Sequence, residues 1–137
     1  MTGQHASLTV ERWARFPFDR QVLMIGNEMN RASKLLDRSD ERSLRACYER
    51  VLALVDLTVQ NQSWPPRRRE LLRWRDLAAN LFIAETPCPD AHAAAFLSLL
   101  RFTPASYAQI PFVLGGSTTP SHLPSRTRPR DCNSLSS

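Results

Sequence analysis

Arginine collects at one place in the sequence. Five of the nine residues from Arg67 to Arg75 are arginine, and Trp64 stands just before them. A guanidinium group binds phosphate or carboxylate through two parallel hydrogen bonds, and an exposed indole ring offers a surface on which a nucleotide base can stack. The spacing therefore predicts contact with a nucleic acid or an acidic protein. The candidate contact residues are Trp64, Arg67, Arg68, Arg69 and Arg73.

The position of this cluster supports the hypothesis, because Pro65 and Pro66 precede it and predict that it opens a helix. Positive charge in a first helical turn opposes the helix dipole, at a cost of roughly a few tenths of a kcal/mol for each residue. We therefore expect Arg67 to Arg69 to serve contact and not folding. Two simpler explanations stay open. One is a solvated basic turn, and the other is a coding bias toward arginine, which supplies 17 of the 18 basic residues.

A second polar set lies on one face of a predicted helix, at steps of seven, four and three residues. This stripe could meet an anion, and the simpler alternative is a solvated face. Its members are Arg20, Asn27, Arg31 and Lys34. Gly26 interrupts the same helix at a cost of roughly 1 kcal/mol relative to alanine. We expect a close helix crossing at this glycine, where a side chain would clash.

Several common catalytic arrangements lack their residues. The histidines His5, His92 and His122 stand in no Glu-x-x-His or His-Glu-x-x-His motif, which would supply helical zinc or di-iron ligands. We expect a structural or neutral role for each of them. Cys47 falls on an apolar helix face, where a thiol is usually inert packing. The sequence therefore indicates no catalytic, metal-binding or cofactor-binding residue, and we expect no cofactor.

Three carboxylates keep a helical metal-dependent enzyme open as an alternative. Glu28, Asp56 and Asp76 fall on three different predicted helices, and inward carboxylates of this kind can hold magnesium. No main helix carries them as a Glu-x-x-Glu pair, so the competing interpretation is ion pairing with the abundant arginine. Arg75 lies near the apolar edge of its helix, and we expect it to pair with Glu28 or Asp56.

The elements that must position these residues are helices. Apolar residues recur at steps of three and four over residues 19–36, 40–60, 67–85 and 90–102, with Asp19 and Asp90 as the expected N-caps. No segment alternates with a period of two. We therefore predict an all-α fold, an up-down bundle of three main helices plus a short fourth. The expected shared core is Val22, Ile25, Met29, Val51, Val55, Trp74, Leu77 and Leu81.

Composition divides the chain into three parts. Residues 1–18 form a polar N-terminal arm, residues 19–102 the helical bundle domain, and residues 103–137 a tail rich in Pro, Ser and Thr. Prolines recur too often after Thr103 for any helix, so we expect the tail to be largely disordered and dispensable from about Gly115.

The length of 137 residues, the hydrophobic content of 42% and the net charge of +5 indicate one small soluble domain. Three cysteines without an export signal, and no apolar run that could cross a membrane, point to a cytoplasmic protein with reduced thiols. The broad apolar helix faces favour a small non-enzymatic interaction module that self-associates as a homodimer. The alternatives are a basic nucleic-acid-binding module that uses Arg67 to Arg75, and the metal-dependent enzyme.

Overall fold

The computed structural model of the chain describes residues 9–38 and 40–114. Every regular element in these two stretches is a helix, which confirms the all-α prediction. The bounds of the four long helices agree with the predicted ranges to within two residues at each end. The helices are α2 (Val10–Ala14), α3 (Phe18–Arg38), α4 (Glu41–Asn61), α5 (Pro65–Ile83), α6 (Pro89–Leu100), α7 (Pro104–Tyr107) and α8 (Ile110–Val113).

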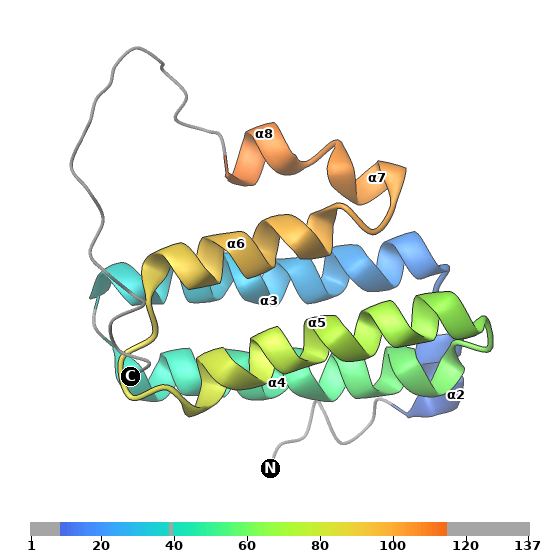
Figure 1. Cartoon of the computed structure of the whole chain (residues 1–137), viewed down its shortest axis with the longest axis horizontal. Coiled ribbons are helices and arrows are strands. Elements are labelled where there is room, and N and C mark those ends of the chain that lie inside the picture. The colour runs from blue at the N-terminus through green and yellow to red at the C-terminus, as the bar shows by residue number, and fades with distance from the viewer. Residues whose placement is uncertain (1–8, 39, 115–137) are drawn as a thin grey trace.

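The long helices α3, α4, α5 and α6 lie side by side along the long axis of the molecule, and successive helices run in opposite directions (Figure 1). Helix α3 packs against α4 and α6, and α5 packs against the same two helices from the other side. The short helix α2 covers one end of α4, and α7 contacts α3. No helix within the two described stretches is long and apolar enough to span a membrane.

The starts of the long helices depart from the sequence-based N-caps. Helix α3 begins at Phe18 and α6 at Pro89, so Asp19 and Asp90 lie inside the first turns and do not cap them. In the first turn the two carboxylates still interact favourably with the positive end of the helix dipole. Asp40 caps α4 instead, because its side chain accepts a hydrogen bond of 3.2 Å from the backbone N–H of Ser43. A proline in the first turn starts α5 and α6.

The predicted core is confirmed except at Leu77. The other seven members are buried and belong to one continuous cluster shared by the long helices. Leu77 is 45% exposed, because it lines the open groove between α5 and the end of α6. The sequence periodicity assigned Leu77 to the buried face of α5. Helices α4 and α6 cover a narrower face of α5 than the periodicity indicated.

The N-terminal arm contributes to the folded body through Trp13 of α2, which is fully buried. Its indole N–H donates a hydrogen bond of 2.9 Å to the hydroxyl of Thr58 on α4. The side-chain amide of Gln21 donates to the carbonyl of Trp13 at 2.9 Å and ties α2 to α3. Trp13 therefore anchors α2 to the core of the helical bundle.

The expectation that proline excludes helix after Thr103 is wrong for residues 104–113. Pro104 opens α7 and Pro111 lies in the first turn of α8, where the missing N–H costs nothing. Thr103 and Ser106 form a capping box, and the Ser106 hydroxyl also donates to the carbonyl of Leu100 at 2.7 Å. The predicted disorder and dispensability of residues 115–137 concern a part of the chain that lies outside the described residues.

Gly26 lies where α3 meets α6, as the close-crossing hypothesis expected. A Cβ atom built on it would lie 3.6 Å from a methyl carbon of Leu100 and 3.7 Å from the ring of Phe96. These are ordinary van der Waals distances, so a methyl group fits. The expected clash is therefore wrong for alanine.

Candidate functional site

The first turn of α5 carries the predicted contact residues. Trp64 occupies the N-cap position without a capping side-chain hydrogen bond, and the first turn contains no acidic residue. The helix begins two residues earlier than predicted, so Arg67, Arg68 and Arg69 all lie within its first turns. The conflict between these charges and the helix dipole is thus present in the folded chain.

Arg67 differs from its two neighbours because it packs onto the fold. The carbon at the centre of its guanidinium group lies 4.2 Å from the ring centre of Phe18 and 5.5 Å from that of Trp64. Cation–π contacts of this kind are attractive, and the side chain is half-buried. Arg67 therefore also contributes to the fold, because it joins the starts of α3 and α5, and its contact with a partner stays a prediction.

Arg68, Arg69 and Arg73 are exposed. Within the described residues, none of the three has a carboxylate within ion-pair distance, since the pairs found there involve Arg31, Arg50 and Arg75. Trp64 beside them is 57% exposed. The structure therefore leaves an aromatic ring and three uncompensated positive charges around the start of α5.

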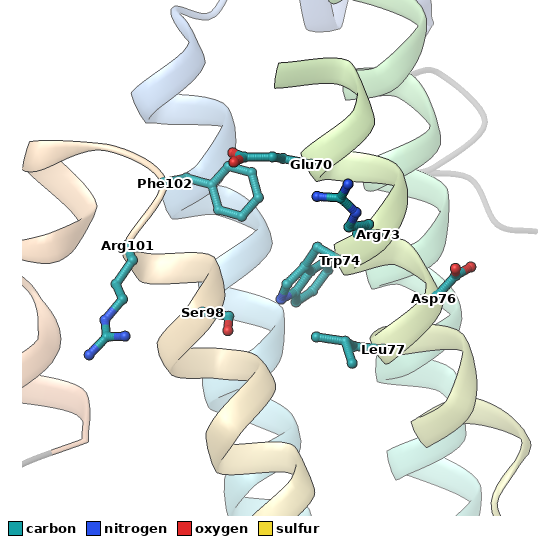
Figure 2. A pocket seen from close by; sticks show the side chains of 8 residues that line it. All are labelled: Glu70, Arg73, Trp74, Asp76, Leu77, Ser98, Arg101 and Phe102. Atoms are coloured by element: carbon teal, nitrogen blue, oxygen red, sulfur yellow. The ribbon is translucent and has the colours of Figure 1, made fainter. Parts of the chain in front are cut away.

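A groove of about 640 Å³ lies between α5 and the end of α6. Figure 2 shows Trp74, Leu77 and Ser98 facing the space between the helices, with Phe102 closing one end. The indole N–H of Trp74 donates to the carbonyl of Ala95 at 2.8 Å, so Trp74 offers the groove only its apolar ring. The side chain of Arg101 points away from the centre (Figure 2). No residue that lines this groove is a histidine or cysteine.

Apolar side chains are also exposed on the outward face of α5, which sequence reasoning missed. Leu72 is 43% exposed and Ile83 is 67% exposed, and Ala79 lies between them at helical spacing. Four of the six large exposed apolar side chains of the described residues lie on α5 or at its N-cap. The signal was available in the sequence, because Leu72 and Ile83 fall outside the stripe that packs against α4 and α6.

The second predicted stripe is exposed along α3. Arg20, Asn27, Arg31 and Lys34 are all exposed, and Asn27 also lines a small cavity of about 70 Å³ together with Gly26 and Phe96. Arg31 lies 3.7 Å from the carboxylate of Glu28 in a loose ion pair. The stripe is thus partly neutralised, unlike the start of α5.

The three carboxylates considered as magnesium ligands do not meet. Glu28 accepts a hydrogen bond of 3.1 Å from Arg50, and Asp56 accepts one of 2.6 Å from Arg75, which confirms the predicted interhelical pair. The hydrogen bond that Arg75 donates to Asp56 raises the pKa of the Arg75 guanidinium above its ordinary value. Across residues 9–38 and 40–114, no three metal-ligating side chains are grouped to hold an ion.

The two described cysteines differ in how deeply they are buried. Cys47 is a free thiol on the buried face of α4, as predicted, and burial raises its pKa above the ordinary value. A thiol that resists ionisation is a poor nucleophile, which agrees with a packing role. Cys88 is the N-cap residue of α6 and is half-buried.

His92 is the centre of a buried polar network that sequence reasoning did not foresee. Its Nε2 lies 3.1 Å from the Met29 carbonyl and 2.9 Å from the Ser33 hydroxyl, and its Nδ1 lies 2.8 Å from the Tyr48 hydroxyl. A carbonyl can only accept, so Nε2 carries the proton and Nδ1 accepts from Tyr48. Burial lowers the pKa of His92 to about 4, and the bond to Met29 offsets part of that effect. The imidazole is therefore neutral and links α6 to α3 and α4, which confirms its structural role.

Comparison with known proteins adds no relative to this description. No protein-family model matches the chain, and neither a curated protein nor a solved structure matches it.

Proposed function

We propose that this chain is a protein-interaction module whose contact surface is the outward face of α5. The observation that carries the proposal is the row of Leu72, Ala79 and Ile83, which leaves two large aliphatic side chains in water on one helix face. Aliphatic side chains that are two-fifths to two-thirds exposed lose much of the favourable transfer free energy that burial would provide, roughly 25 cal/mol for each Å². Contact with another apolar helix recovers it.

The surroundings of this row suit a protein partner. Arg69 and Asp76 flank Leu72 of this row with charges of opposite sign, and polar side chains are typical of the rim of a protein interface. The groove between α5 and α6 adds the partly exposed apolar side chains of Leu77 and Phe102. Self-association, expected from the sequence, and capture of a helix from another protein both fit this surface. Neither requires catalytic chemistry.

Site-specific photo-crosslinking tests the proposal. A benzophenone amino acid replaces Leu72 in the full chain inside its native cell, and the matched control places it at Ala53, which is exposed on α4. We expect covalent protein adducts after irradiation from position 72 and few from position 53. Equal yields from the two positions, or none from position 72, would remove α5 as the contact surface.

A second candidate function is binding of single-stranded nucleic acid at the start of α5. It is favoured by the exposed Trp64 and by the three arginines that no described carboxylate neutralises. Bases stack on aromatic rings, and each phosphate contact makes the affinity more sensitive to salt.

Fluorescence anisotropy with labelled single-stranded RNA and DNA tests this candidate over a range of salt concentrations. The triple variant Arg68→Gln, Arg69→Gln, Arg73→Gln should flatten the slope of log affinity against log salt by about 2 units, at roughly 0.7 for each contact. The matched control changes three exposed charges elsewhere, Arg38→Gln, Arg42→Gln and Arg45→Gln, and should leave the slope unchanged. If the parent does not bind at about 50 mM salt, this candidate is excluded.

A further inference from the structure

The exposed side chains on the outward face of α5 follow a charge order that matches an antiparallel copy of the same helix. Arg69, Leu72 and Asp76 are exposed, and their spacing of three and four residues places them on one face of the helix. An aliphatic side chain thus stands between a positive and a negative one, seven residues apart. Within the described residues neither Arg69 nor Asp76 takes part in an ion pair.

In an antiparallel pair of α5 helices, these opposite charges come together. If the two-fold axis passes beside Leu72, Arg69 of one copy stands level with Asp76 of the other, because both are nearly equally distant from the axis. The symmetry repeats the contact, and the two Leu72 side chains meet at the centre. A parallel pair in register would place Arg69 against Arg69, and like charges across an interface oppose association.

The antiparallel pair also supplies the negative charge that the first turn of α5 lacks. The first five residues of α5 include Arg67, Arg68 and Arg69, and its first turn contains no acidic residue, so this charge opposes the helix dipole. In the antiparallel pair the Asp76 carboxylate of the second copy lies beside Arg69 and within reach of Arg73, one turn further along. A negative charge then approaches the positive end of the helix from outside the chain.

We infer that the partner of this surface is a second copy of the chain, with the two α5 helices antiparallel and with reciprocal ion pairs between Arg69 and Asp76 around Leu72. The inference rests on the proposed function and names its partner. A helix from another protein needs a matching charge order of its own, whereas a second copy carries it by symmetry.

Charge-reversal variants, studied alone and as a mixture, test the inference. Native mass spectrometry and sedimentation measure dimer formation by the full chain. Arg69→Glu alone places a glutamate against Asp76, and Asp76→Arg alone places an arginine against Arg69. Each variant should therefore weaken its own dimer by about tenfold or more. In a mixture of the two variants, the introduced glutamate of one chain faces the introduced arginine of the other, and the second contact keeps the native pair of Arg69 and Asp76. The heterodimer should therefore form in preference to either homodimer.

The double variant Arg69→Glu, Asp76→Arg in one chain restores both contacts and should dimerise like the parent. The matched control uses Arg42 and Glu49, which are exposed on α4 at the same spacing of seven residues. Arg42→Glu and Glu49→Arg should leave dimerisation unchanged. All of these side chains are exposed, and far-ultraviolet circular dichroism verifies that each variant keeps its helix content.

Three results would overturn the inference. They are a parent chain that stays monomeric at about 100 µM, single reversals that dimerise as well as the parent, and a mixture without preferred heterodimer. Failure of the inference is distinguishable from failure of the proposed function. If position 72 crosslinks to a different protein while the parent is monomeric, the interaction surface stands and the second copy is excluded. If position 72 gives no adduct and the parent is monomeric, both proposals fail.

Discussion

The phenol hydroxyl of Tyr48 donates a hydrogen bond of 2.8 Å to Nδ1 of His92, and this contact joins α4 to α6 inside the core. Both side chains are buried. Burial raises the pKa of Tyr48 above its ordinary range, so the phenol keeps the proton that it donates. The same burial holds His92 neutral, and the stability of the bundle therefore depends on the charge state of one imidazole.

Acidification should destabilise the fold through His92. Its pKa is about 4 in the folded chain against 6.5 for an unperturbed imidazole. The unfolded chain therefore binds this proton first as the pH falls. The stabilising effect is complete above about pH 6.5 and is lost progressively between pH 6.5 and 4, up to an order of 3 kcal/mol in the free energy of unfolding. Urea denaturation at pH 7.5, 5.5 and 4.5 measures this loss.

The control for that prediction is His92→Gln, which removes the titrating group. The variant should be less stable than the parent at pH 7.5, because the network loses hydrogen bonds. It should also depend less on pH between 6.5 and 4.5. An identical pH dependence in the two chains would show that another group causes it.

Gly26→Ala should stabilise the bundle. Alanine in a helix interior is favoured over glycine by about 1 kcal/mol, and the added methyl group makes ordinary contacts with Leu100 and Phe96. The free energy of unfolding by urea should rise by up to that amount. Gly26→Leu, which needs space that α6 occupies, should lower it. A destabilised alanine variant would show that the crossing of α3 and α6 is tighter than described.

Thr58→Val should cost about 1–3 kcal/mol of stability, because it leaves the buried indole N–H of Trp13 without an acceptor. The loss is measured by chemical denaturation. Thr86→Val provides the matched control, since Thr86 is exposed and the same exchange there should change stability little. Equal effects at the two positions would mean that α2 does not depend on this hydrogen bond.

The long helices and the pair between Arg75 and Asp56 could be predicted because both follow from local spacing. Steps of three and four residues define the buried face of a helix, and a charged residue at the edge of that face seeks a partner on the next helix. Trp13 and His92 could not be placed in this way. Their hydrogen-bond partners Thr58 and Tyr48 lie 45 and 44 residues away, and no period in the sequence records such a distance.

The candidate site was predictable in part for a similar reason. The arginine run was visible as composition, but the stacking of Arg67 on Phe18 depends on how the ends of two helices meet. The exposure of Leu77 depends on the groove that α5 and α6 leave between them. Proline was read as a helix breaker after Thr103, whereas Pro104 starts a helix, and only the following residues decide between these roles.

Sedimentation equilibrium of the full chain tests the pairing of α5 helices most directly. The parent, the variant Leu72→Arg and the control Ala53→Arg are compared over a range of concentrations. The account predicts that the parent and the control exceed the monomer mass of 15.6 kDa increasingly with concentration, while Leu72→Arg remains at that mass. A parent that stays at 15.6 kDa throughout, or a Leu72→Arg variant that associates like the parent, would contradict it.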